Sequence, residues 1–299
     1  MEYLPLQRRD FLKLASAAAV VPIGLNRAAA VSPAYEAAHP RLLPGCCAYS
    51  YRKYLEKGPM TMEQFIVKAV ELGILGVEVT TYYLKSTEPG YLAGLRSFAY
   101  KQGMAFVGLS IGTQMCQPDP TKRKESVEVI KKWVDATDLC GASHLRVFGD
   151  QAPPGTTEEQ AVHFVAETMK EACDYAAGKG IILGIESHGG TTAKASNILE
   201  ILRRVDSPYA RITLDISNFP ENPYEQIEAC IPYATHSHIR DTFGKPLRPL
   251  DLDRVWSLFA KAGYKGYMSA EYEGDEEPMT GVPKLIEKIR LLCRKYSSA

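Results

Sequence analysis

Hydrophobic and polar positions follow one repeating order along most of this chain. Short runs rich in β-branched and other apolar residues alternate with longer stretches in which apolar residues recur every three or four positions. The first pattern is typical of buried strands and the second of amphipathic helices. The short runs predict eight strands, at residues 45–50, 74–80, 105–111, 144–149, 181–187, 211–217, 235–241 and 267–272.

The spacing of these strands predicts the fold class. Strand-then-helix units recur at intervals of about 30 residues over about 250 residues, as an α/β protein with a (β/α)8 TIM barrel requires. Three of the amphipathic stretches begin at Thr61, Thr121 and Thr157 and end at glycines, in agreement with helix capping. The alternative is a doubly wound open sheet, which would need fewer strands or a second domain. No glycine-rich phosphate loop follows the first strand, so we favour the barrel.

The N-terminus reads "QRRDFLKLASAAAVVPIGLNRAAA", with paired arginines, a short apolar stretch and then alanines. It resembles a twin-arginine export signal, which implies the twin-arginine translocation machinery as a partner and a periplasmic or otherwise exported protein. The apolar stretch is too short to favour a spanning helix, so we expect no stable membrane insertion. An uncleaved anchor or a plain helix is the alternative. The expected division is residues 1–30 as signal peptide, 31–44 as N-terminal extension and 45–299 as barrel.

Charge and cysteine content restrict the function. Lys plus Arg and Asp plus Glu both number 35, so the chain lacks the basic excess that neutralises nucleic-acid phosphates, and we expect no nucleic-acid partner. The seven cysteines show neither a zinc-ribbon spacing nor a disulfide framework. We interpret them, Cys46 and Cys47 included, as small buried residues. The sequence leaves the oligomeric state open.

Candidate chemistry lies at the ends of the last four predicted strands. Catalytic groups of such barrels come from the carboxyl ends of strands. These ends carry Glu186 and His188, Asp215 and Asn218, His238 and Arg240, and Glu271. Each carboxylate alone would be read as a helix cap or an ion-pair partner. Three of them brought together would raise one another's pKa unless a cation lay among them.

A bound divalent metal ion resolves that conflict. The expected ligands are Glu186, Asp215, His238 and Glu271. Three oxygens and one imidazole nitrogen suit Mn²⁺, with Mg²⁺, Co²⁺ or Zn²⁺ as alternatives. His236, which shares a strand face with His238, is expected one layer deeper and not to be a ligand.

The ordered set of Glu186 in "IES", Asp215 in "LDIS", His238 in "HIRD" and Glu271 in "AEY" resembles the metal quartet of the xylose-isomerase-like barrels. This superfamily includes ketose 3-epimerases, hydroxypyruvate isomerases, inosose isomerases and dehydratases, and endonuclease IV. The resemblance implies one divalent ion that chelates a carbohydrate substrate. Glu186 and Glu271 would then transfer protons beside a carbonyl through an enediolate.

Three positions depart from the ketose 3-epimerase pattern. Asn218 stands where those enzymes commonly carry a histidine, Thr192 where they carry a second glutamate, and Gly244 where an arginine often follows the metal histidine. The resemblance therefore predicts the chemistry of the superfamily more closely than one reaction. An endonuclease IV-like activity would need further histidine and acidic ligands, and we do not expect it.

Five residues are expected to bind substrate. Glu78 and Arg146 end the second and fourth strands and would contact sugar hydroxyls or an acid group; the alternative for each is an ion pair within the barrel. His188 would contact substrate or act as an auxiliary acid or base, unless it is a plain surface histidine. Asn218 and Arg240 complete the set.

Three functions fit these residues. The first is a metal-dependent isomerase or epimerase of sugars or keto-sugars. The second is a lyase or dehydratase that acts on 3-keto-glycosides or inosose-like compounds, which would use the same enolate but expel a leaving group. The third is a non-catalytic sugar-binding barrel, for which a complete metal quartet would have no purpose. We favour the first.

Overall fold

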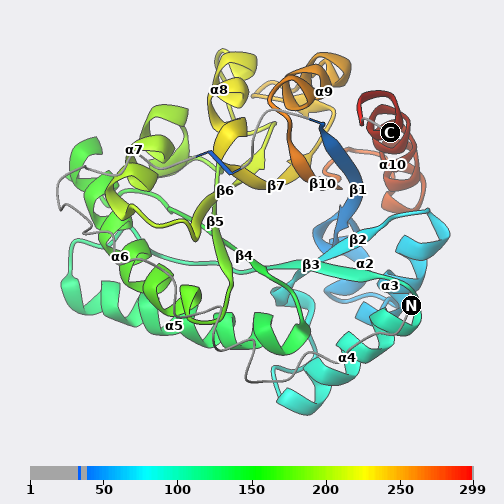
Figure 1. Cartoon of the computed structure of the whole chain (residues 1–299), viewed down its shortest axis with the longest axis horizontal. Coiled ribbons are helices and arrows are strands. Elements are labelled where there is room, and N and C mark those ends of the chain that lie inside the picture. The colour runs from blue at the N-terminus through cyan, green and yellow to red at the C-terminus, as the bar shows by residue number, and fades with distance from the viewer. Residues whose placement is uncertain (1–32, 35–38, 298–299) are drawn as a thin grey trace, which may run out of the picture.

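The computed structural model describes residues 33–34 and 39–297, so the expected signal peptide at residues 1–30 lies outside the described residues. Eight parallel strands close into a barrel in the order β1-β10-β7-β6-β5-β4-β3-β2, which confirms the predicted (β/α)8 class (Figure 1). The barrel strands are β1 (Arg41–Cys47), β2 (Gly76–Thr80), β3 (Ala105–Ser110), β4 (His144–Val147), β5 (Ile182–Glu186), β6 (Ala210–Asp215), β7 (Ala234–Ile239) and β10 (Lys265–Ala270). A small antiparallel pair, β8 (Thr242–Phe243) with β9 (Arg248–Pro249), follows β7.

Helices surround the barrel on its outside (Figure 1). They are α2 (Arg52–Leu55), α3 (Met62–Glu71), α4 (Pro89–Lys101), α5 (Pro120–Cys140), α6 (Glu158–Ala177), α7 (Ala195–Val205), α8 (Pro223–Cys230), α9 (Leu252–Lys261) and α10 (Pro278–Tyr296). Short 3₁₀ turns are η2 (Ala48–Tyr51), η3 (Thr81–Tyr83), η4 (Gly190–Thr192) and η5 (Ile231–Tyr233). Within the described part of the chain, none of these helices has the length and apolar character needed to cross a membrane.

Local sequence signals explain where the helices begin. Thr61 and Gln64 form a reciprocal capping box at the start of α3, and Thr157 and Gln160 do the same for α6. Each pair satisfies two backbone N–H groups that the first helical turn leaves without partners. The predicted caps at Thr61 and Thr157 are therefore confirmed. The predicted cap at Thr121 is wrong, because α5 begins at Pro120 and Asp119 caps it by accepting a hydrogen bond from Thr121 N.

The first strand differs from its prediction. It spans Arg41–Cys47 and not residues 45–50, and η2 begins directly after it. Pro44 cannot donate a hydrogen bond, and for that reason it looks like a strand boundary in the sequence. Its carbonyl nevertheless accepts a hydrogen bond from Leu75 N (3.1 Å), so pairing continues through the proline. The barrel accordingly starts earlier than the predicted boundary at residue 45.

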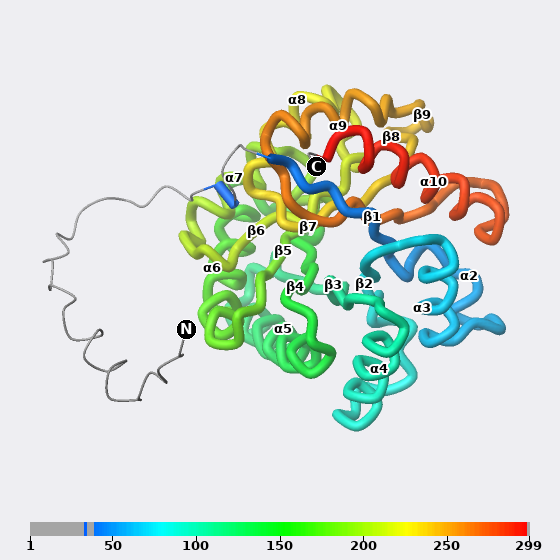
Figure 2. Tube along the Cα trace, turned by 45° about the vertical axis from the view of Figure 1, so that its right-hand side comes forward, coloured from blue at the N-terminus to red at the C-terminus, as the bar shows by residue number. Residues whose placement is uncertain are grey.

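The barrel closes where its first and last strands meet. β1 lies against β10 and α10 (Figure 2), and Arg41 pairs with Lys265 at the start of the register. Ser297, just after α10, accepts a hydrogen bond from Leu42 N (2.8 Å) and donates one to Leu42 O (3.1 Å). The seam is thus tied at the end of the barrel opposite the carboxyl ends of the strands.

The inside of the barrel is unusually polar. Its fully or almost fully buried polar side chains include Glu78, Ser110, His144, Thr213, His236, His238 and Ser269. Space for one of them comes from a glycine: a Cβ on Gly184 would lie 2.3 Å from His144 Nε2 and 2.4 Å from Thr213 Oγ1. Gly184 therefore makes room for the imidazole of His144 beneath the strand ends.

We expect Gly184→Ala to destabilise the protein by about 1–3 kcal/mol, because the added methyl group overpacks a closed barrel. The matched control is Gly94→Ala in α4, where a Cβ meets nothing within 4 Å. There the substitution should stabilise by roughly 0.5–1 kcal/mol, through helix propensity and a less flexible unfolded chain. Urea unfolding of both variants tests the contrast; equal effects would contradict it.

Candidate active site

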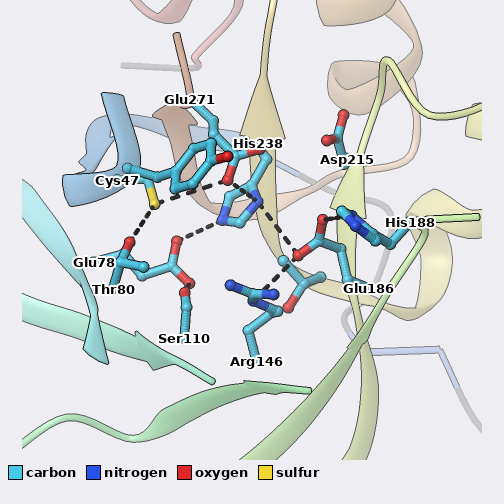
Figure 3. Close-up of polar contacts among 12 residues, drawn as sticks. Cys47, Glu78, Thr80, Ser110, Arg146, Glu186, His188, Asp215, His238 and Glu271 are labelled. Atoms are coloured by element: carbon cyan, nitrogen blue, oxygen red, sulfur yellow. Dashed lines mark hydrogen bonds and ion pairs between the residues drawn. The ribbon is translucent and has the colours of Figure 1, made fainter. Parts of the chain in front are cut away.

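Four side chains meet at the carboxyl ends of four neighbouring strands (Figure 3). Glu186 and Asp215 are the last residues of β5 and β6, His238 is in β7, and Glu271 follows β10 directly. All four are buried, with at most 7% of their surface exposed. The order of the strands in the sheet makes these ends contiguous, so the topology itself gathers the four groups.

The geometry of this group fits a metal ion. One donor atom from each of the four residues lies within 4.8 Å of the others. His238 Nδ1 is 3.4 Å from Glu271 Oε1 and 3.7 Å from Glu186 Oε2. His238 Nδ1 and Glu186 Oε2 are buried and make no hydrogen bond. Because buried polar atoms are normally satisfied, a cation among these atoms would complete the site.

Glu186 is flanked by the side chains of Arg146 and His188. Arg146 Nε lies 3.2 Å from its Oε2, and His188 Nδ1 lies 3.1 Å from its Oε1. Although burial opposes ionisation, the Arg146 charge and the His188 hydrogen bond hold the pKa of Glu186 below its ordinary value. The ring of Phe148 packs against both, with its centroid 3.9 Å from the Arg146 guanidinium and 4.2 Å from the His188 ring. Phe148 thereby packs Arg146 and His188 beside one carboxylate.

Asp215 receives three hydrogen bonds. Ser217 N donates to Oδ1 (2.8 Å), and Asn218 Nδ2 (2.7 Å) and Arg240 Nη2 (2.6 Å) donate to Oδ2. Arg240 also binds Glu273 through Nη1 (2.6 Å). Asn218 and Arg240, both expected to bind substrate, are thus engaged with a candidate metal ligand. Burial nevertheless raises the pKa of Asp215, and the Arg240 charge only partly offsets this effect.

Glu271 has a different environment. Burial raises the pKa of Glu271 to about 7. The interaction with His238 opposes this increase, whereas the negative charges of Glu186 and Asp215 favour it. Cys47, the last residue of β1, lies beside it, with Sγ 4.0 Å from Glu271 Oε1 and 3.4 Å from Thr80 Oγ1. The sequence predicts Cys47 only as a small buried residue and does not indicate its place at the site. Because the first strand was predicted to run to residue 50, the position of Cys47 at a strand end becomes visible only in the structure.

Glu78 lies beneath this group and not in the barrel mouth. It is completely buried, and its Oε2 is 2.5 Å from His238 Nε2 and 3.3 Å from His236 Nε2. Ser110 donates a short hydrogen bond to its other oxygen. Of the five expected substrate-binding residues, His188 is the exposed one, with 55% of its side chain accessible; Arg146 is buried behind Glu186.

Fold and site together define a (β/α)8 barrel with a buried carboxylate–histidine group at the carboxyl ends of its strands. The profile of the xylose isomerase-like TIM barrel family matches residues 66–293, and the chain belongs to this family.

Relatives of known activity include sugar epimerases. Fructoselysine 3-epimerase of Shigella flexneri is 25% identical over 267 residues, which cover 78% of this chain and 94% of the relative. Among solved structures, D-allulose 3-epimerase from Methylomonas sp. in complex with D-allulose aligns with a TM-score of 0.66 at 19% identity, covering 88% of this chain and 100% of that one. The 3-keto-D-glucoside 4-epimerase of E. coli aligns with a TM-score of 0.68 at 14% identity, covering 84% and 99%. At these identities the structural matches show the fold alone.

The pKa of Glu271 predicts how stability depends on pH without divalent ions. Unfolded Glu271 titrates near its ordinary value of 4.5, and the folded carboxyl at about 7. Between these pH values only the folded state holds the proton, so stability should fall as pH rises from about 4.5 to about 7. The loss attributable to this group is on the order of 3 kcal/mol.

Glu271→Gln should remove that loss. We expect its unfolding free energy, measured by urea titration with EDTA present, to decline less than that of the unmodified protein across this interval. Parallel pH profiles for the two proteins would contradict the prediction.

Proposed function

We propose that this chain is a divalent-metal-dependent isomerase or epimerase of sugars or keto-sugars, which moves a proton at a carbon beside a carbonyl. The observation that carries the proposal is the convergence of Glu186, Asp215, His238 and Glu271 around one point, where His238 Nδ1 is buried and makes no hydrogen bond. The sugar-epimerase relatives support the same reaction class. The ion we propose is Mn²⁺, because three oxygen donors and one imidazole suit it.

A bound divalent ion would supply Lewis-acid polarisation of the substrate carbonyl, without which the neighbouring C–H is too weak an acid. The chain itself would supply the proton transfers. Glu186, held ionised by Arg146 and His188, is suited to accept the proton. Glu271, the second carboxyl group beside the same point, is suited to return one. Unequal surroundings thus give two similar carboxyl groups different roles.

The exposure of the side chains around the site indicates which of them can contact a substrate. His188 is the accessible side chain at the end of β5, and it touches both Glu186 and the ring of Phe148. We propose that His188 contacts a sugar hydroxyl. Arg146 and Arg240 are paired with Glu186 and Asp215, so they would act mainly by orienting those carboxylates.

Export is a separate part of the proposal. The paired arginines Arg8 and Arg9, followed by a short apolar stretch, support export through the twin-arginine pathway to the periplasm. A free or glycosidic sugar would then be a better candidate substrate than a sugar phosphate.

The decisive experiment loads the purified protein with Mn²⁺ and incubates it in D₂O with D-allulose, D-fructose or a 3-keto-glucoside. We expect solvent deuterium to enter the recovered sugar at a carbon beside the carbonyl, as detected by NMR. Glu186→Gln should lower the exchange rate roughly 10²–10⁴-fold, because a general base is lost. Glu228→Gln, an exposed change on α8, is the matched control and should exchange normally.

Other results would redirect or end the proposal. Release of the aglycone from a 3-keto-glucoside without an isomerised product would replace the epimerase by the lyase. A protein that binds Mn²⁺ yet exchanges no substrate proton with any of these sugars would contradict the proposed reaction.

A further inference from the structure

We propose that Glu78 is a positioning residue that holds His238 so that Nδ1, and not Nε2, faces the three carboxylates. The inference rests on the proposed function, because it concerns how the candidate metal ligand is presented. It also assigns Glu78 a role other than the substrate contact expected from the sequence.

The two nitrogens of His238 face different partners. Nε2 is 2.5 Å from Glu78 Oε2, whereas Nδ1 is directed to Glu186 and Glu271 at 3.7 and 3.4 Å (Figure 3). A neutral imidazole donates from one nitrogen and offers a lone pair on the other. A carboxylate that accepts from Nε2–H therefore leaves the Nδ1 lone pair free for a metal.

Glu78 is itself held in place. Ser110 on β3 donates to one oxygen, and the imidazoles of His236 and His238 on β7 lie on the other. Its side chain has no exposed surface, so it is closed to a substrate that enters from the mouth. The carboxylate of Glu78 on β2 therefore contacts the neighbouring strand β3 and, across the barrel, strand β7.

This arrangement explains the spacing of the two histidines in β7. His236 and His238 lie on the same strand face, as two ligands of one metal would. In the structure they instead share Glu78 Oε2, and His236 lies 3.3 Å from it. Of these two imidazoles, only that of His238 reaches the carboxylate group above.

The test measures Mn²⁺ affinity by calorimetric titration of metal-free protein, with the thermal midpoint of the same metal-free samples recorded alongside. Glu78→Gln keeps the shape but removes the charge, and Glu78→Asp keeps the charge but shortens the reach. We expect both to weaken Mn²⁺ binding roughly 10–100-fold. Glu71→Gln, an exposed change on α3, is the matched control and should bind like the unmodified protein.

A kinetic readout separates positioning from other roles. Saturating Mn²⁺ should restore most of kcat in Glu78→Gln, while the Mn²⁺ concentration for half-maximal rate rises by the same factor as Kd. An unchanged Kd for both Glu78 variants would overturn the proposal. So would a raised sugar KM with normal Mn²⁺ affinity, which would mark Glu78 as a substrate contact.

Ser110→Ala keeps the proposal testable if the Glu78 variants do not fold. It frees one oxygen of Glu78 without touching His238, and we expect a several-fold loss of Mn²⁺ affinity; no loss would overturn the proposal. Failure of the unmodified protein to bind any divalent ion would instead remove the proposed function. The two failures are therefore distinguishable.

Discussion

Buried negative charge at one end of the barrel is the constraint on which the rest of this structure depends. Glu186, Asp215 and Glu271 lie out of water within a few ångströms of one another. Their mutual repulsion in a medium of low polarity would favour protonation or opening of the strand ends. The surrounding architecture supplies compensation: Arg146 and His188 on Glu186, and Arg240 on Asp215. Cations are therefore part of the framework and not additions to it.

The same buried charge also influences which side chains lie beneath the three carboxylates. His238 stands between the upper carboxylates and the lower one, Glu78, and presents one ring nitrogen to each side. Such an interior contrasts with the branched apolar residues that fill most barrels of this kind. The polar layer needs space as well as charge, and the glycine at position 184 provides it for His144. A rigid, hydrogen-bonded interior keeps the ligands oriented before any ion or sugar arrives.

Sequence periodicity was sufficient for the fold, because each strand end carries its own local signal. It also placed Glu186, Asp215, His238 and Glu271 at strand ends that the structure brings together. Sequence periodicity could not predict the partners of Glu78, because the direction of side chains across a closed barrel depends on strand register and shear. Cys47 was missed for a related reason: its significance comes from Glu271, which lies far away in the sequence. Pro44 obscured the start of β1, since a proline that lacks its N–H still accepts through its carbonyl and keeps its register with the neighbouring strand.

The seam between the two ends of the chain has a consequence for the order of folding. Leu42 and Ser297 are 255 positions apart, yet they exchange hydrogen bonds across that seam. During synthesis β1 emerges first and keeps one edge without a partner until β10 and α10 follow. Closure is thus postponed until almost the entire chain has been made, and an exposed strand edge is a template for pairing with other chains. Pairing of β10 with β1 therefore ends the interval in which the nascent barrel can associate through this edge, and Ser297, just after the last helix, adds hydrogen bonds to the closed seam.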